Sequence, residues 1–246
     1  MEAREYERLA AVEGEMWWFR GLHANLVAAL RRSFGGERAA ILDAGCGTGG
    51  LLVALGGALP QAMLFGLDLD EGAAATARAK SGRPVCVASI DRLPFADGAF
   101  DAVMSADVLC HEGVDEGAAL AGLRRCLRPG GTLILNLPAY PWLFSAHDVA
   151  VANARRYARG ELCRLLAHAG FTSIHAVYWN SFLFPLMLLR RKVWRGGQPA
   201  GGSEVALLPA PLERVFGAVM ALENRLLKAG IGLPFGGSIL ATAVRP

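Results

Sequence analysis

A chain of 246 residues is long enough for one domain with a sizeable hydrophobic core and some additional helices. Its net charge of +3 is too small to indicate a nucleic-acid partner, and its five cysteines include no C-x-x-C pair, so their spacing indicates neither a zinc site nor a disulfide framework. Because the first five residues are rich in charge and no secretory apolar run follows them, we expect a cytoplasmic protein.

Residues 1–35 are expected to form two helices. Apolar side chains recur there at helical spacing, first at Tyr6, Leu9 and Val12 and then at Leu22, Leu26, Ala29 and Leu30. The three consecutive aromatic residues 17–19 lie between these stretches and cannot all face one core from one helix. They indicate either a hydrophobic fastening of the helices to the domain or a lid over a bound ligand, in which Trp18 would contact the substrate.

The next segment predicts a strand, a glycine-rich turn and a helix. An apolar run ends at Leu42, residues 43–49 read Asp-Ala-Gly-Cys-Gly-Thr-Gly, and residues 51–59 resume an apolar pattern of helical length. Such a turn lets backbone N–H groups approach a ligand closely, and the start of the helix adds unpaired donors. Since Asp43 would repel a phosphate, the turn favours a ligand that carries positive charge and hydroxyl groups.

Strands and helices alternate over residues 39–138. Strands are expected near 39–43, 63–67, 84–88, 99–105 and 131–137, and helices near 49–58, 71–80 and 115–127. This alternation predicts a parallel sheet with helices on both faces, and ligands of such sheets bind beyond the carboxyl ends of the strands, where the strand order reverses. Asp43, Asp68, Ser89 and Ser105 all fall at predicted carboxyl ends, so we expect them to converge on one crevice.

Five segments in this region carry a family resemblance. In order and in spacing, they resemble the motifs of class I S-adenosylmethionine-dependent methyltransferases over roughly residues 38–138; the segments are 43–49, 64–68, 88–95, 100–109 and 127–135. The resemblance implies a Rossmann-like, doubly wound, seven-stranded and mostly parallel sheet. It also implies S-adenosyl-L-methionine as the cofactor, with S-adenosyl-L-homocysteine as its product.

The resemblance assigns cofactor contacts to individual residues. Asp68 would accept hydrogen bonds from both ribose hydroxyls, and Leu69 would pack on the adenine. Related enzymes usually have Asp where this chain has Ser89, so the adenine contact is expected from Ser89 with the Ile90 amide, while Asp91 either compensates or caps a helix. The remaining contacts are expected at the methionine part of the cofactor, from Asp43, Gly45, Cys46, Gly47, Thr48 and Gly49 in the turn and from Ser105 and Ala106.

Acceptor-side residues are expected after the fourth and fifth strands. A general base is needed only for a protonated acceptor, and the candidates are His111, His147 and Asp148, each with a structural role as the alternative. His147 and Asp148 cannot be assumed to form a dyad, because neighbouring side chains often diverge. Further candidate walls or anchors of an acceptor pocket are Tyr140, Trp142, Arg156 and Tyr157.

The second half of the chain adds elements around this core. A loop is expected over 139–151, a helix near 159–169, a strand near 172–179, a helix near 210–229 and an antiparallel last strand near 238–244 that closes the sheet. The expected division is a helical lid at 1–35, a cofactor-binding core at 36–181, an apolar helical insertion at 182–236 and a final core strand at 237–246.

The insertion begins with an apolar run followed by basic residues. Residues 182–189 are too few to span a bilayer, which takes about 20 residues, and Pro185 interrupts them. With Arg190, Arg191, Lys192 and Arg195 behind it, segment 182–195 is either a helix of the core, a homodimer contact, or a peripheral contact with a membrane or a lipid-like substrate.

These observations favour methyl transfer from S-adenosylmethionine to a small, hydrophobic metabolite or natural-product intermediate. A nicotinamide-dependent oxidoreductase is the second hypothesis, disfavoured because its pyrophosphate would meet Asp43. A non-catalytic protein that binds the cofactor is the third.

Overall fold

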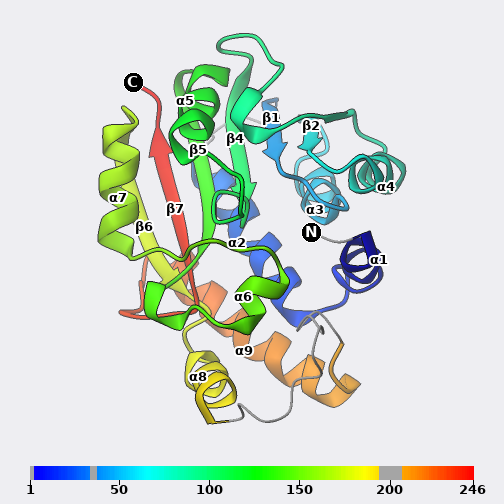
Figure 1. Cartoon of the computed structure of the whole chain (residues 1–246), viewed down its shortest axis with the longest axis vertical. Coiled ribbons are helices and arrows are strands. Elements are labelled where there is room, and N and C mark those ends of the chain that lie inside the picture. The colour runs from blue at the N-terminus through cyan, green and yellow to red at the C-terminus, as the bar shows by residue number, and fades with distance from the viewer. Residues whose placement is uncertain (1–2, 34–37, 194–206) are drawn as a thin grey trace.

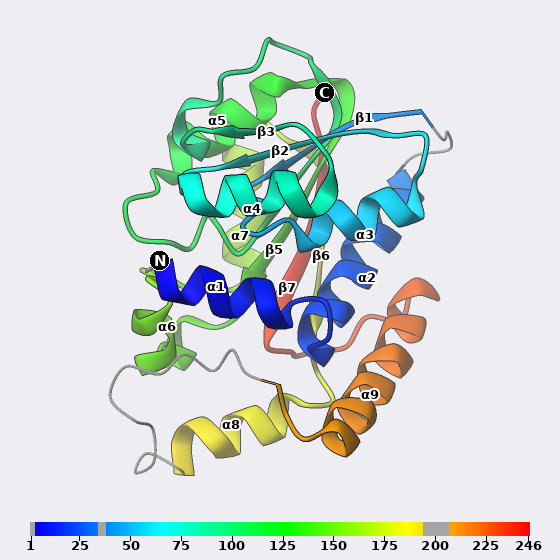
Figure 2. The same cartoon turned by 90° about the vertical axis from the view of Figure 1, so that its right-hand side faces the viewer.

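The computed structural model describes residues 3–33, 38–193 and 207–246 of the chain. They form one twisted sheet with helices on both faces and further helices gathered at one end (Figures 1 and 2). The strands are β1 Ala40–Ala44, β2 Met63–Asp68, β3 Val85–Val87, β4 Phe100–Ala106, β5 Leu127–Pro138, β6 Thr172–Trp179 and β7 Ser238–Val244. The α-helices are α1 Ala3–Val12, α2 Trp17–Ser33, α3 Gly50–Ala58, α4 Glu71–Ser81, α5 Glu116–Cys126, α6 Ala146–Ala150, α7 Arg159–His168, α8 Phe184–Val193 and α9 Ala210–Lys228.

The sheet has the order β3-β2-β1-β4-β5-β7-β6. β1 pairs in parallel with β2 and with β4, β2 pairs in parallel with β3, and β4 pairs in parallel with β5, which confirms the predicted doubly wound fold. The strand order reverses between β1 and β4. That position is the switch point at which a parallel sheet opens a crevice.

The last strand is antiparallel, as predicted, but it does not lie at the edge of the sheet. β7 pairs with β5 on one side and with β6 on the other, so β6 is the outermost strand. Residues Ser238–Ala241 and Ala243 are buried, which is consistent with a strand that has a neighbour on both sides.

Two apolar layers enclose the sheet. α5 and α7 bury Leu120, Leu123 and Leu162 on one face. On the other face α2, α3, α4 and α9 form a second layer, in which Leu26, Leu30 and Leu55 are fully buried. α2 therefore packs on the sheet as part of this layer, whereas α1 lies against α4 at the rim of the layer (Figure 2).

The expected loop at 139–151 contains a short helix. α6 begins after Ser145, whose side chain and backbone form a capping box with Asp148. The sequence signal for this start is a Ser followed three residues later by an acid, and we did not predict a helix from it.

The segment between β6 and β7 is fastened to the rest of the chain. Glu223 of α9 is fully buried and accepts hydrogen bonds from the backbone N–H groups of Ser181 and Phe182. Trp17 packs edge-on against Phe216, and the backbone N–H of Trp17 donates a hydrogen bond to the Glu213 carboxylate. Glycine and proline residues over 196–203 predict a linker within the insertion; this linker and the end of the basic segment at 194–195 lie outside the described residues.

None of the helices in the described part of the chain combines the length and the apolar character that crossing a bilayer requires.

Candidate active site

The carboxyl ends of β1, β2, β4 and β5 meet at one edge of the sheet, and α1, α6 and α8 lie at that same end of the molecule (Figures 1 and 2). Hydrogen bonds tie these ends together. The N–H groups of Gly45 and Cys46 donate to the Leu67 carbonyl, and the Ser105 hydroxyl donates to the Ala44 carbonyl. The structure thus brings the predicted residues of β1, β2 and β4 together at one edge of the sheet, where the sequence predicts a crevice.

The glycine turn has a conformation that a larger residue could not adopt without strain. Gly45 has a φ of 87°, and a Cβ atom added to it would lie 2.2 Å from Cγ2 of Val108. Gly49, also with a φ of 87°, lies against the backbone of Ala77 and leads directly into α3, whose first residue has no side-chain cap. Gly49 itself offers no side-chain cap to α3, and the Glu13 carboxylate lies close to Gly50, the first residue of that helix.

Asp43 is a buried acid at the carboxyl end of β1. Its residue is 1% exposed, and its Oδ2 atom is buried without a hydrogen-bond partner among the described residues. Burial, followed by the negative charges of Asp68 and Glu13, raises the pKa of Asp43 to about 8. A positively charged group placed beside it would relieve this cost.

Asp68 lies at the end of β2 and holds the glycine turn in place. Its Oδ2 accepts from the Gly47 N–H at 2.8 Å and its Oδ1 from the Asp70 N–H at 3.0 Å. Tyr6 of α1 hydrogen-bonds to Asp68, and burial together with this carboxylate raises the pKa of Tyr6. Leu69 is 71% exposed, so its side chain is accessible to a ligand.

α1 lies over the glycine turn. Leu9 comes within 3.7 Å of the position of a Cβ atom at Gly47. Glu13, which follows α1, accepts a hydrogen bond from the Thr48 hydroxyl and forms an ion pair with Lys80. Thr48 is thereby engaged with the N-terminal segment.

On the predicted adenine side, Ser89 caps a short helix, whereas Asp91 keeps an unpaired side-chain oxygen. The Ser89 hydroxyl accepts from the Asp91 N–H at 3.2 Å and caps a short 3-10 helix, Ile90–Arg92. Ile90 is buried. The Oδ1 atom of Asp91 is buried and has no hydrogen-bond partner in the described part of the chain, so it can accept a hydrogen bond from a ligand.

Three of the predicted acceptor-side residues are engaged with the protein itself. Asp148 is fully buried, accepts from the Ser145 N–H and forms an ion pair of 2.8 Å with Arg156. Arg156 also donates to the Ala139 carbonyl. The Tyr157 hydroxyl lies 2.5 Å from Glu116 Oε1, and burial followed by this carboxylate raises the pKa of Tyr157. These contacts fasten α6 and the segment before α7 to the core.

The two candidate histidines, His111 and His147, lie on different segments. His111 follows β4, its Nδ1 lies 3.2 Å from the Ala152 carbonyl, and burial lowers its pKa. Burial thus favours the neutral form of this imidazole. His147 is half-buried on α6, next to the buried Asp148.

Aromatic side chains form a cluster at this end of the sheet. Tyr140 stacks on Tyr178 at 5.1 Å and contacts Trp142 and Phe184. Trp18 stacks on Trp179 at 6.0 Å. Tyr140 and Trp18 thus pack in different apolar layers, on opposite faces of the sheet. Trp142, at 56% exposure, extends the cluster around Tyr140 towards solvent.

The comparisons with known proteins agree on one family. A family model described as a methyltransferase domain matches residues 42–135. A malonyl-[acyl-carrier protein] O-methyltransferase of Geobacter sulfurreducens is 30% identical over 188 residues, which are 70% of this chain and 67% of that protein. A protein of the same description from Legionella pneumophila is 32% identical over 162 residues, covering 63% of this chain and 53% of its own length. The chain belongs to the class I S-adenosylmethionine-dependent methyltransferases.

A solved structure agrees in fold. It is described as a methyltransferase dependent on S-adenosylmethionine and a "possible histamine N-methyltransferase" from Thermotoga maritima, and it superposes with a TM-score of 0.61. It is 21% identical and covers 99% of this chain and 95% of its own. The family makes S-adenosylmethionine the expected cofactor of this methyltransferase.

The crevice fits that cofactor chemically. S-adenosylmethionine carries a sulfonium, an ammonium and two ribose hydroxyls. The buried, unpaired oxygen of Asp43 requires a cation or a donor, and the glycine turn provides the close approach that a Cβ atom would prevent. The unpaired Asp91 oxygen is an acceptor of the kind that an adenine amino group needs.

Asp107 also lies among these strand ends, and the sequence did not lead us to predict it as a site residue. It follows β4 with a φ of 56°, and Asn136 donates a hydrogen bond of 2.8 Å to its Oδ2. Burial raises its pKa to about 7, although the hydrogen bond from Asn136 and the charge of Arg156 oppose this shift. The available signal was an acid two residues after Ser105, at a third strand end of the same crevice.

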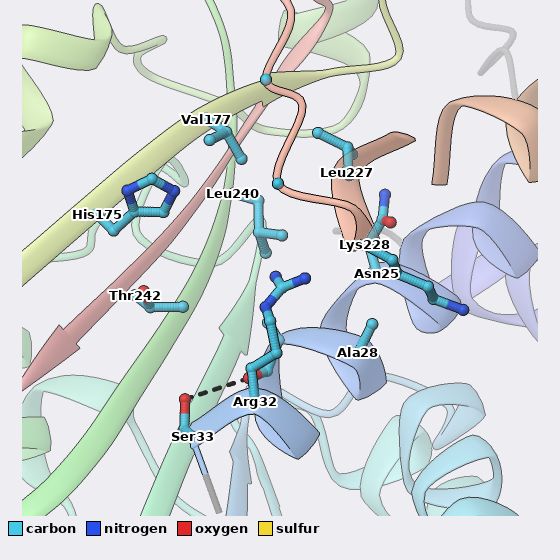
Figure 3. Close-up of a pocket in the computed structure, with 13 residues that line it drawn as sticks. Asn25, Ala28, Arg32, Ser33, His175, Val177, Leu227, Lys228, Leu240 and Thr242 are labelled. Carbon is cyan, nitrogen blue, oxygen red and sulfur yellow. Dashed lines mark hydrogen bonds between the residues drawn. The ribbon is translucent and has the colours of Figure 1, made fainter. Parts of the chain in front are cut away.

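A separate cavity of about 260 Å³ lies on the face of the sheet between α2, α9 and strands β6 and β7 (Figure 3). Leu227 and Leu240 form part of its apolar floor, and Arg32, Lys228 and His175 stand around it. None of the predicted site residues lines this cavity.

Proposed function

We propose that this methyltransferase transfers a methyl group from S-adenosylmethionine to a small, hydrophobic acceptor. The single observation that carries the acceptor class is the aromatic cluster of Tyr140, Tyr178, Trp142 and Phe184 at the carboxyl end of the sheet. Phe144, Val149 and Phe182, close in sequence to members of this cluster or on α6, are all more than 40% exposed. A hydrophobic acceptor would cover this surface and displace its water.

The cofactor is held, in this proposal, by the residues of the crevice. Asp68 is the ribose acceptor, Ser89, Ile90 and Asp91 face the adenine, and Asp43 faces the charged methionine part. The bound cofactor supplies an activated methyl group on a sulfonium, so the protein has to align the acceptor and exclude water rather than provide a covalent intermediate. α1 lies over the glycine turn and is the proposed lid.

α8 offers a route by which such an acceptor could arrive. Leu186 and Leu189 are 49% and 57% exposed, and basic residues follow them in the sequence. We propose that this segment contacts either a lipid-like acceptor at a membrane surface or a second copy of the chain. If α8 contacts a membrane surface, the wild type should sediment with anionic lipid vesicles and the Leu186→Ser/Leu189→Ser variant should not. If α8 contacts a second copy of the chain, the sedimentation coefficient without vesicles should be that of a dimer for the wild type and of a monomer for the variant.

The experiment that tests the function is a search for the labelled product. The protein is incubated with methyl-labelled S-adenosylmethionine and with a cell extract divided into an organic-soluble and an aqueous fraction, and mass spectrometry seeks a labelled compound. We expect the label in the organic-soluble fraction. A labelled polar metabolite would contradict the hydrophobic acceptor.

Malonyl-[acyl-carrier protein] is included as a separate acceptor because two relatives are described as its methyltransferases. If S-adenosylhomocysteine binds and no fraction is labelled, the result favours the non-catalytic alternative.

A further inference from the structure

Asp107 lies at the carboxyl end of β4, on the side of that strand where β5 runs. It lies immediately after β4, and the next residue, Val108, packs against the glycine turn at Gly45. The Asp107 carboxylate lies on the other side, against Asn136 of β5, so it faces away from β1. The loop that carries Asp107 therefore lies at the switch point. This places it between the residues proposed to hold the cofactor and the aromatic cluster proposed to contact the acceptor.

A chain of hydrogen bonds fixes the orientation of this carboxylate. The indole Nε1 of Trp179 donates to Asn136 Oδ1 at 2.7 Å, and an indole N–H is a donor only. The amide of Asn136 must therefore present its NH₂ group to Asp107, at 2.8 Å. Asn136 is fully buried and Trp179 is held by stacking on Trp18, so Asp107 is supported by rigid strands rather than by a loose loop.

The remaining oxygen of Asp107 is available. In the part of the chain that the structure describes, Asn136 donates the one side-chain hydrogen bond that Asp107 accepts, and the residue keeps some exposure to solvent. The backbone adopts the left-handed region at this residue, with a φ of 56°, a conformation that Asp tolerates better than most residues. Arg156 and Cys110 are the ionisable groups that interact with it electrostatically.

We propose that Asp107 faces the reactive methyl group from the acceptor side and takes the proton of the attacking group. The proposal rests on the proposed function and narrows it to an acceptor with a removable proton, which is a hydroxyl, an ammonium or a carbon acid.

The step is balanced without a further reactant. The acceptor atom loses its proton to the Asp107 carboxylate and uses the freed electron pair to form a bond to the methyl carbon. The methyl–sulfur bond breaks, its electron pair returns to sulfur, and the sulfonium becomes the neutral thioether of S-adenosylhomocysteine.

The other ionisable groups fit this task less well. Asp148 already neutralises Arg156, and its residue is fully buried. His111 has its Nδ1 against the Ala152 carbonyl, so this nitrogen is the donor and Nε2 alone could accept a proton. Burial raises the pKa of Asp107 to about 7, where a carboxylate base and its acid are both present at neutral pH, whereas the pKa of His111 is lowered.

The test uses sinefungin, which needs no acceptor. In sinefungin a carbon that bears an ammonium replaces the sulfur and its methyl group, so the ammonium marks the position of the transferred methyl. A carboxylate beside that position should bind the ammonium by a charge-assisted hydrogen bond, which S-adenosylhomocysteine cannot form. Isothermal titration calorimetry measures both ligands on wild type, on Asp107→Asn and on the control Asp97→Asn, whose acid is an exposed partner of Arg125.

We expect wild type and Asp97→Asn to bind sinefungin at least tenfold more tightly than S-adenosylhomocysteine at pH 8, and Asp107→Asn to lose this preference while its affinity for S-adenosylhomocysteine stays within about threefold of wild type. The same preference in all three proteins would overturn the proposal. If no preference appears in wild type, the proposal is overturned as well.

The pH dependence of wild type provides the second measurement, which stands even if Asp107→Asn does not fold. An aliphatic ammonium stays protonated between pH 6 and 8. The ratio of the two affinities should therefore rise about tenfold over this range as Asp107 loses its proton. Asp43 affects both ligands equally and cancels in the ratio, since both carry the amino-acid ammonium. A flat ratio contradicts the proposal, whereas failure of wild type to bind either ligand removes the proposed cofactor site itself.

Discussion

Replacement of Asp43 by Asn tests the electrostatic design of the crevice. The folded chain keeps a carboxyl group in a fully buried position beside two other acids, and its pKa rises from 3.8 to about 8. The folded state therefore holds a proton that the unfolded state has released, between about pH 4 and pH 8. Because the unfolded state binds fewer protons in this window, stability falls as the pH rises through it.

The magnitude follows from the same shift. Between pH 3.8 and pH 7, each pH unit lowers the free energy of unfolding by about 1.36 kcal/mol, because the unfolded state has released the proton that the folded state keeps. At pH 7 the ligand-free protein is therefore less stable by about 4 kcal/mol than it would be without this shift. Asn keeps the shape and removes the charge. We expect Asp43→Asn to be more stable than wild type by up to this amount at pH 7, which corresponds to a rise in Tm of roughly 10 °C for a chain of this length.

Differential scanning calorimetry at pH 4, 6 and 8 measures this effect. The difference in Tm between Asp43→Asn and wild type should be small at pH 4 and should increase up to pH 8. S-adenosylhomocysteine should reverse the order, because its ammonium stabilises the ionised Asp43 of wild type and finds no charge in the variant. Calorimetric titration of wild type at pH 7 in two buffers with different ionisation enthalpies should show that binding releases a proton.

Two results would refute the reasoning about Asp43. One is a stability difference that does not change between pH 4 and pH 8, which would mean that the carboxyl group is not protonated in the ligand-free protein. The other is unchanged affinity of Asp43→Asn for S-adenosylhomocysteine, which would show that the ligand's positive charge lies elsewhere.

Three further substitutions probe the crevice and its support. Gly45→Ala should destabilise the chain by at least about 2 kcal/mol more than the control Gly113→Ala, since both positions have a positive φ but the added Cβ meets Val108 at 2.2 Å only at Gly45; urea unfolding measures it, and equal losses would contradict the packing argument. Asp68→Ala should weaken binding of S-adenosylhomocysteine by about 1–3 kcal/mol in calorimetric titration, through the ribose and through loss of the hydrogen bond that positions Gly47; an unchanged affinity would remove Asp68 from the site. Arg156→Met should cost about 3–5 kcal/mol because it leaves Asp148 buried without its ion pair, and Asp148→Leu/Arg156→Met should recover much of that loss in urea unfolding; a double variant no better than the single one would show that the carboxylate is not the source of the cost.

The sequence predicted those parts of the structure that depend on local pattern. Strands β1, β2, β4, β6 and β7 lie within one or two residues of their expected positions. They could be predicted because the spacing of apolar residues differs between buried strands and amphipathic helices. The convergence of β1, β2 and β4 at one edge followed from parallel topology alone.

Residues whose roles depend on partners distant in sequence could not be predicted in the same way. Asp148 was a candidate base until the structure showed its ion pair with Arg156, which no spacing rule predicts. Asp107 was missed for the same reason, because its orientation depends on two residues distant in sequence. Asn136, which donates to Asp107, is 29 positions further along the chain, and Trp179, which donates to Asn136, is 43 positions beyond Asn136.

The placement of β7 has a consequence for the order in which the molecule is assembled. β5 and β6 both lack a partner along the edges that β7 later fills, and residues 180–237 must be synthesised before that strand exists. A nascent chain therefore carries two open, largely apolar strand edges while the long insertion emerges, and such edges invite pairing with other chains. We expect fragments that stop before Ser238 to aggregate more readily than the whole chain, because β5 and β6 keep these edges open in them.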